Sequence, residues 1–180
     1  MAKRVERDEQ KRFETIVLPH LKSAYNLARW LTRNEHDAED VIQEAFLRAF
    51  RSFDTFLPGR DARAWFLSIV RNTCFTWLRQ NRPRELTGPP EGGLDSVMDL
   101  GLDPEAVLIN KASSDVVRQA LEELPLEYRE ILALRELEGL SYKEIAQLVD
   151  IPLGTVMSRL SRARKGLYLL LGQTIRGAKQ

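Results

Sequence analysis

The sequence predicts an all-α protein of two small helical domains, and three observations support this fold class. Apolar residues recur at three- and four-residue spacing, whereas strand-like alternation does not persist in any segment. A stretch rich in Gly and Pro, from Arg84 to Pro104, has no periodicity and is typical of a flexible linker. The length of 180 residues suits one ordinary domain or two very small ones.

Three amphipathic helices are predicted before the linker. Pro58 and Gly59 end the second helix, and the third stops before Pro83. Their apolar stripes can bury against one another as a small bundle. The stripes are Phe13, Ile16, Val17, Leu21, Ala24, Ala28 and Leu31 on a single first helix; Ala38, Val41, Ile42, Ala45, Phe46, Ala49, Phe50 and Phe53 on the second; and Ala62, Trp65, Phe66, Ile69, Val70, Thr73 and Trp77 on the third.

Shorter helices are predicted after the linker. Pro125 separates the first two of them, and Gly139 ends the second. Their stripes are Val116, Val117, Ala120, Leu121 and Leu124, followed by Ile131, Leu132 and Leu137.

The segment LSYKEIAQLVDIPLGTVMSRLSRARKGL predicts a helix-turn-helix. Ser141 and Glu144 have the spacing of a capping box, which opens a short helix. Asp150 to Pro152 makes the turn into a second helix. The expected buried residues are Ile145, Ala146 and Leu148 on the first helix and Val156, Leu160, Ala163 and Leu167 on the second.

The second helix of this pair has an acid-free outer surface. A helical wheel places Gly154, Met157, Ser158, Ser161, Arg162 and Lys165 opposite the core, with Thr155, Arg159 and Arg164 on the flanks. Small residues near the helix start and cations along its exposed side fit the major groove of DNA. A basic solvated helix in a bundle is the alternative, but the neighbouring helix is acidic (Glu127, Glu130, Glu136 and Glu138), which favours DNA binding.

The net charge of +1 conceals a block-like distribution of charge. Residues 1–34 carry 8 basic and 4 acidic groups, and residues 35–54 carry 2 basic and 6 acidic groups. Residues 60–84 hold six arginines against one acid, and residues 85–108 hold six acids with no Lys or Arg. Residues 151–180 carry six basic groups and no acid. Such blocks are typical of a protein that contacts DNA at two places.

Two surfaces of the N-terminal helices are candidate interfaces. The second helix exposes Leu47 on an otherwise polar side. The third helix presents arginines interleaved with an aromatic ring, a pattern that suits unpaired nucleic acid because cations follow phosphates and rings stack on bases. The alternative is that these rings are core residues; we prefer it for Trp65 and Trp77 and leave it open for Phe75.

Three segments together resemble the extracytoplasmic-function sigma factors of the sigma-70 family. They read DAEDVIQEAFLRAFRSFDTF, AWFLSIVRNTCFTWLR and LPLEYREILALRELEGLSYKEIAQLVDIPLGTVMSRLSRAR, in the order that the family shows. Region 2 of the family would cover about residues 10–84 and region 4 about residues 111–172. We therefore expect domains at 1–84 and 111–180, joined by an acidic linker at 85–110.

The resemblance implies a factor without catalytic chemistry that directs promoter-specific initiation by RNA polymerase. It implies contacts with the clamp coiled coil and flap of the core enzyme, with promoter DNA and with an anti-sigma factor. The loop from Asp54 to Asp61 matches the segment that captures a flipped base. The expected contact sets are Asp40, Gln43, Glu44, Leu47 and Arg51 for polymerase; Phe56, Arg60, Arg63, Arg71, Asn72, Phe75 and Arg79 for the −10 strand; and Thr155, Met157, Ser158, Arg159, Ser161, Arg162 and Lys165 for the −35 duplex.

Other classes of protein fit the sequence less well. A homodimeric helix-turn-helix regulator needs a sensory domain and gives the acidic linker no role, and a sigma mimic would lack the basic residues of the DNA-reading helix. An enzyme or metal site is disfavoured because His20 and His36 have no ligand partners at metal spacing, and no cofactor is expected. The lone Cys74 excludes an internal disulfide, and no apolar run reaches the roughly 20 residues of a membrane span. We expect a bacterial cytoplasmic protein with no membrane insertion and no small-molecule substrate.

Overall fold

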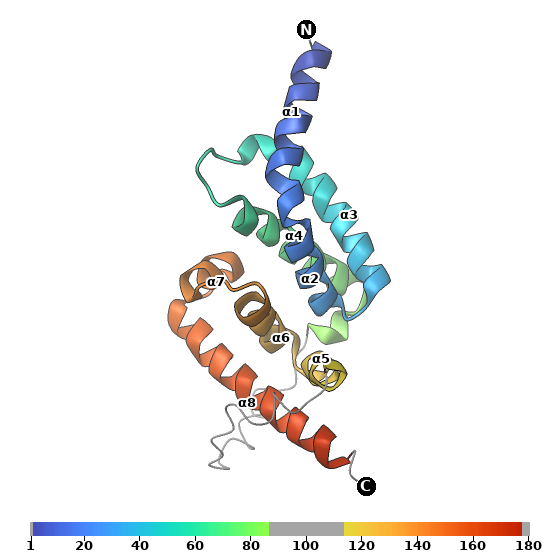
Figure 1. Cartoon of the computed structure of the whole chain (residues 1–180), viewed down its shortest axis with the longest axis vertical. Helices are drawn as coiled ribbons and strands as arrows, with labels where there is room; N and C mark the ends of the chain where they lie inside the picture. Colours follow the sequence, from blue (N-terminus) through green and yellow to red (C-terminus); the bar gives the residue numbers. More distant parts are fainter. Residues whose placement is uncertain (1, 87–113, 178–180) are drawn as a thin grey trace. The chain divides into compact units, whose positions relative to one another are not determined.

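The computed structural model describes residues 2–86 and 114–177, and this part of the chain contains helices and turns but no strand (Figure 1). The predicted all-α fold class is confirmed. The described residues divide into two compact units: residues 2–81 together with Gln147–Val149, and residues 82–86 and 114–146 together with residues 150–177. The predicted acidic linker lies almost wholly outside the described residues.

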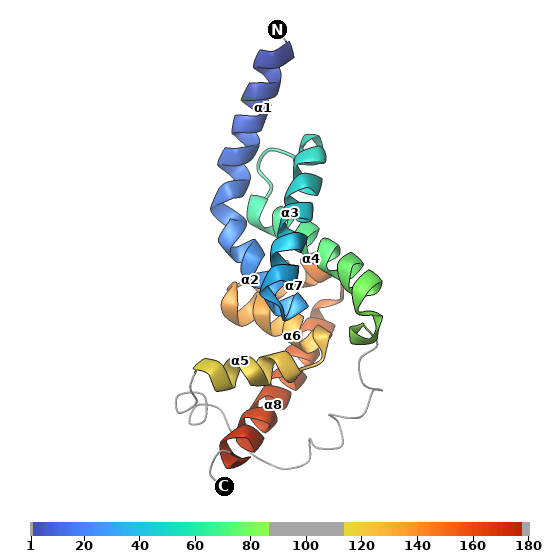
Figure 2. The ribbon, with the colours of Figure 1, turned by 90° about the vertical axis from the view of Figure 1, so that its right-hand side faces the viewer.

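The first unit consists of four α-helices and two short 3-10 turns. These are α1 (Ala2–Val17), η1 (Leu18–His20), α2 (Leu21–Thr32), α3 (Glu35–Arg51), η2 (Phe53–Thr55) and α4 (Ala62–Asn81). Helices α2, α3 and α4 pack against one another in pairs, and the N-terminal part of α1 extends beyond the other helices of this unit (Figure 2). The fully buried Leu27, Leu31, Phe66, Leu67 and Val70 form the centre of the core. The predicted stripes include Leu31, Phe66 and Val70 but omit Leu27 and Leu67.

The prediction of one continuous helix through residues 13–31 is wrong. The chain leaves the α-helix at Val17 and passes through η1 before α2 begins at Leu21. Pro19 lies inside η1, where its missing N–H and its ring exclude a regular α-helical turn. The apolar stripe nevertheless continues across the interruption, because Phe13, Val17 and Ala24 are all buried.

An aromatic cluster joins α1 to the end of α3 and the start of α4. The Phe13 ring makes edge-to-face contacts with Phe46, Phe50 and Phe53 at centroid distances of 5.0, 5.1 and 5.2 Å. Phe50 contacts the cluster as its place in the predicted stripe implies, but it is 46% exposed and therefore not buried. It lies at the edge of the cluster, where one side of the ring contacts Phe13 and the other faces solvent.

The second unit is built around a long C-terminal helix. Its elements are η3 (Pro83–Glu85), α5 (Ser114–Glu123), α6 (Leu126–Leu132), η6 (Ala133–Leu137), α7 (Tyr142–Val149) and α8 (Leu153–Gly177), except that the last residues of α7, Gln147–Val149, cluster with the first unit. Helix α8 packs against both α5 and α6 (Figure 1). Its core-facing residues Val156, Leu160 and Ala163 are at most 1% exposed, and Leu167 is also buried, as the helical wheel predicts.

A single π-helical turn changes the register after α6. The N–H of Glu138 donates to the carbonyl oxygen of Ala133 at 3.0 Å, five residues back, and η6 therefore holds one residue more than an α-turn. Leu134 is consequently buried and Leu137 is 49% exposed, which corrects the prediction that Leu137 belongs to the core stripe. Gly139, with φ +67°, ends the segment in the left-handed region, as the sequence predicts.

A buried arginine fixes the corner between α5 and α6. The Nη1 atom of Arg129 donates to the carbonyl oxygens of Glu122 at 3.2 Å and Leu124 at 3.0 Å, where α5 has ended and its carbonyls lack helical partners. Arg129 is 2% exposed, and its Nη2 atom lies 3.7 Å from Oε2 of Glu85. This side chain is therefore a structural element of the second unit.

Candidate nucleic-acid and polymerase interfaces

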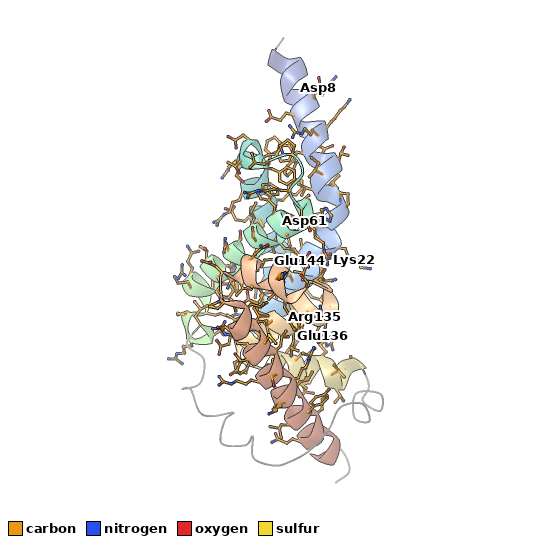
Figure 3. All side chains as sticks on the ribbon, turned by 90° about the vertical axis from the view of Figure 1, so that its left-hand side faces the viewer. Asp8, Lys22, Asp61, Arg135, Glu136 and Glu144 are labelled. Carbon is orange, nitrogen blue, oxygen red and sulfur yellow. The ribbon has the colours of Figure 1, made fainter. Side chains whose placement is uncertain are left out.

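The helix-turn-helix has the local geometry that the sequence predicts. The Ser141 hydroxyl accepts from the N–H of Glu144 at 3.2 Å, and the Glu144 carboxylate accepts from the N–H of Ser141 at 2.6 Å, which completes the capping box of α7. Figure 3 shows Glu144 at the start of that helix. Asp150 takes up φ +58° and ends α7, and the carbonyl oxygen of Pro152 accepts from the N–H groups of Thr155 and Val156 to begin α8.

The outer surface of α8 also lies where the helical wheel places it. The residues on the outward half are all exposed, and those on the flanks are partly buried. The exposed set is Gly154, Met157, Ser158, Ser161, Arg162 and Lys165, and the flanking set is Thr155, Arg159 and Arg164. The exposed face bears two cations and no acid, which gives it a positive potential toward a phosphate backbone.

The two flanking arginines pair with acids of the preceding segment. Arg159 Nη2 lies 3.3 Å from Oε2 of Glu127 on α6, and Arg164 donates to Oε1 of Glu136 in η6 from Nη2 at 2.7 Å and Nε at 3.2 Å (Figure 3 labels Glu136). The hydrogen bonds from Arg164 to Glu136 raise the pKa of Arg164 above its ordinary value. Contact of Arg159 with DNA would require exchanging Glu127 for a phosphate, so the predicted contacts of α8 are not equivalent.

The acids next to α8 have two different roles. Glu127 and Glu136 are exposed and bind its arginines, whereas Glu130 and Glu138 are buried at 2% and 6% exposure. The sequence places all four acids on one helix, but Glu127 and Glu130 lie in α6, whereas Glu136 lies in the π-turn η6 and Glu138 follows it.

The predicted −10 residues lie on α4 and in the loop before it. Arg60, Asn72 and Arg79 are exposed, and Arg63, Arg71 and Phe75 are partly buried. The Arg71 guanidinium lies 4.4 Å from the centroid of the Phe75 ring and covers one of its faces. A base stacking on Phe75 would therefore use the opposite face of the ring or displace Arg71.

Phe56 is not a surface residue, and this corrects its assignment as a base contact. It is 6% exposed, stacks on Phe53 at 5.9 Å and lies 5.1 Å from Trp65. A ring in this position anchors one end of the loop in the aromatic cluster. The exposed apolar residue of the loop is Leu57, at 53%.

The outer face of α3 carries the predicted polymerase residues. Asp40, Gln43 and Arg51 are exposed, and Leu47 is 48% exposed. The Glu44 carboxylate accepts a hydrogen bond from Arg48 Nε at 2.7 Å, and this bond lowers the pKa of Glu44 below its ordinary value. Arg48 was missed by the sequence analysis, although the spacing of four residues from Glu44 is the expected signal for such a pair.

Phe50 at 46% and Leu153 at 41% are exposed apolar side chains that were not predicted at the surface. Helical periodicity assigns Phe50 to the core, and a first helical residue has too few neighbours in sequence for periodicity to place Leu153.

The described residues contain no cluster of three or more His, Cys, Asp or Glu residues arranged to hold a metal ion. None of their helices is long and apolar enough to cross a membrane.

Comparison with known families identifies both units. Residues 16–84 match the family model "Sigma-70 region 2", and residues 114–167 match "Sigma-70, region 4". The "ECF RNA polymerase sigma-E factor" of Escherichia coli K12 is 32% identical over 178 residues, which cover 93% of this chain and 90% of the relative. The "ECF RNA polymerase sigma factor SigW" of Bacillus subtilis is 30% identical over 171 residues, covering 92% and 91%.

Solved structures agree with these relatives. The sigma factor RpoE from Bartonella quintana, in complex with the anti-sigma factor NepR, matches with a TM-score of 0.70 and 26% identity over 90% of this chain and 98% of that one. CnrH, in complex with the cytosolic domain of CnrY, matches with a TM-score of 0.65 and 27% identity over 91% and 90%.

Regions 2 and 4 in this order define a sigma factor of the sigma-70 family. Within that family the chain belongs to the ECF RNA polymerase sigma factors. It is therefore a transcription initiation factor, from a family that supplies promoter specificity and not catalysis to RNA polymerase.

Proposed function

We propose that the chain directs RNA polymerase to its promoters through three surfaces. The exposed face of α8 reads the −35 element as duplex, α4 with the loop before it binds the melted −10 strand, and the outer face of α3 binds the clamp coiled coil of core polymerase. The observation that carries the proposal is the acid-free face of α8, which presents Arg162 and Lys165 from a correctly capped helix-turn-helix.

Each unit alone should bind DNA weakly. The net charge of +1 gives little non-specific attraction to phosphates, and a good base contact contributes about 1–3 kcal/mol of discrimination. Polymerase would hold both units at a set spacing, so that the second DNA contact becomes effectively intramolecular. Promoter binding then depends on the polymerase surface of α3 as well as on the DNA surfaces.

The −10 surface combines exposed cations, an exposed amide and a half-covered ring. Arg60 and Arg79 can follow the phosphates of an opened strand, and Asn72 can hydrogen-bond the edge of a flipped base. Phe56 supports this surface from below by fixing the loop to the aromatic cluster.

We also propose that an anti-sigma factor controls the chain in the bacterial cytoplasm. Support comes from the two solved relatives, of which one is in complex with the anti-sigma factor NepR and the other with the cytosolic domain of CnrY.

The proposal is tested by co-elution with sigma-free core RNA polymerase in size-exclusion chromatography. We expect the native chain to co-elute and Leu47→Asp to lose at least tenfold in affinity, because a charge replaces an apolar contact on α3. Leu18→Asp is the matched control, since Leu18 is 46% exposed on η1 and Leu47 is 48% exposed. Failure of the folded native chain to bind core polymerase, or equal loss in both variants, would contradict the proposal.

A further inference from the structure

The start of the DNA-facing helix exposes two apolar side chains. Leu153 is 41% exposed and Met157 is 53% exposed. They lie four residues apart in the first turns of α8, so they occupy the same side of the helix. Burying either one would release its apolar surface from water.

The surroundings of this pair point to DNA as the occupant. Ser158, Ser161, Arg162 and Lys165 are exposed on the same outward half of α8 as Met157, and residues 151–180 contain no acid. Leu153 lies beside Met157, at the edge of that half. A Cβ atom built on Gly154 would have no neighbour within 4 Å, so the helix start has open space in front of it. An exposed apolar side chain on a face that also carries cations complements a phosphate-lined groove that has an apolar group on its floor.

The polar residue beside the patch contributes less to base reading. The hydroxyl of Ser158 donates to the carbonyl oxygen of Thr155 at 3.1 Å, so its proton is already used within α8. Discrimination at this end of the helix therefore rests on the apolar side chains more than on this hydroxyl.

The major groove displays a single apolar group, the C5 methyl of thymine, and the first residues of a recognition helix are those that reach base edges. We infer that Met157, with Leu153 beside it, recognises the 5-methyl group of a thymine in the −35 element. The inference rests on the proposed function, because it requires that α8 binds the −35 duplex. The inference predicts one base of the −35 element, a thymine, whereas the amino-acid sequence alone predicts none.

The test removes the methyl group alone. Transcripts from the reconstituted holoenzyme locate the promoter, and each thymine of its −35 element, on either strand, is replaced singly by deoxyuridine, which retains base pairing. We expect one position at which the native holoenzyme loses roughly fourfold in affinity, the value of one buried methyl group.

Variants of Met157 link that loss to the side chain. Met157→Gln keeps the length of the side chain but adds a polar amide, so a holoenzyme with this variant should bind the thymine and deoxyuridine promoters with equal affinity. A holoenzyme with Met157→Leu should retain the difference in affinity. Leu137→Ala is the control, because Leu137 is equally exposed at 49% but lies in η6, and it should also retain the difference.

Three results would overturn the inference. They are a −35 element without an A·T pair, uracil replacement without effect on the native holoenzyme, and a uracil effect that persists unchanged in Met157→Gln. In each case promoter-dependent transcription is intact, so the proposed function stands. Absence of promoter-dependent transcripts would reject the proposed function and this inference together.

Discussion

Arg164 and Glu136 join α8 to the segment that precedes the helix-turn-helix. Two nitrogen atoms of the guanidinium, Nη2 and Nε, donate to the same carboxylate oxygen at 2.7 and 3.2 Å, across 28 residues of sequence. Arg159 and Glu127 form a second contact between α8 and α6 at 3.3 Å. These pairs link the flanks of α8 to α6 and η6, and they add to the packing of its buried residues Val156, Leu160 and Ala163.

The Arg164–Glu136 pair should show a measurable coupling energy. Its side chains are 39% and 51% exposed, so solvent screening limits the coupling to about 0.2–1 kcal/mol. A double-mutant cycle with Glu136→Gln and Arg164→Gln, followed by amide hydrogen exchange of α8, should give this value in low salt and less in 1 M NaCl. A coupling of zero in low salt would show that the pair does not hold the helix.

The capping box of α7 predicts a stability effect confined to the second unit. Ser141→Ala removes the acceptor for the Glu144 N–H and should destabilise that unit by about 0.5–2 kcal/mol. Ser161→Ala is the control, since Ser161 is exposed within α8 and caps no helix. Thermal unfolding followed by far-UV circular dichroism measures both, and equal shifts would argue against the cap.

The aromatic cluster predicts an effect confined to the first unit. Phe13→Ala removes a 1%-exposed ring in contact with three others and should cost about 3–5 kcal/mol. Phe50→Ala removes a half-exposed ring and should cost clearly less. The three tryptophans all belong to this unit, so their fluorescence during urea unfolding reports it separately, and equal losses in the two variants would contradict the burial argument.

The arginines of α8 should differ in their contribution to salt-dependent DNA binding. Arg162→Gln should reduce the slope of log affinity against log salt by about one unit, because Arg162 is exposed on the outward half and can neutralise a phosphate. Arg159→Gln should reduce it less, because its partner is Glu127. Both slopes are measured from the affinity of the holoenzyme for promoter DNA between about 50 and 200 mM salt, where phosphate contacts change affinity strongly. A larger change of slope for Arg159→Gln than for Arg162→Gln would mean that a DNA phosphate replaces Glu127 as the partner of Arg159.

The sequence predicts the fold well wherever a helix buries a regular stripe. Helix α4 begins and ends close to its expected residues, and the wheel of α8 separates its core from its exposed face correctly. Helix α3 already ends at Arg51, so that Phe53 lies in η2, and α8 continues to Gly177, beyond the predicted stripe that ends at Leu167. The errors lie where backbone geometry changes without losing the apolar pattern. Pro19 interrupts a stripe that remains buried on both sides, and the π-turn of η6 rotates Leu137 outward while Leu134 takes its place.

The candidate sites were less predictable because they depend on contacts between distant segments. Periodicity shows that Arg159 and Arg164 lie on the flanks of α8, but not that Glu127 and Glu136 meet them. Composition offers Phe56 as a ring for base stacking, but it cannot show that Phe53 and Trp65 already cover it. The buried Arg129 has no signal of its own in the sequence, because its partners are backbone carbonyls.

Promoter recognition by this chain is tested by transcription with sigma-free core RNA polymerase supplied with the chain, on genomic DNA of its own bacterium. We expect RNAs with discrete 5′ ends downstream of a shared −35 and −10 pair, and these RNAs should be lost with Leu47→Asp and retained with Leu18→Asp. RNAs no different from those of core polymerase alone, from a native chain that is folded and bound to the enzyme, would contradict promoter recognition by this chain.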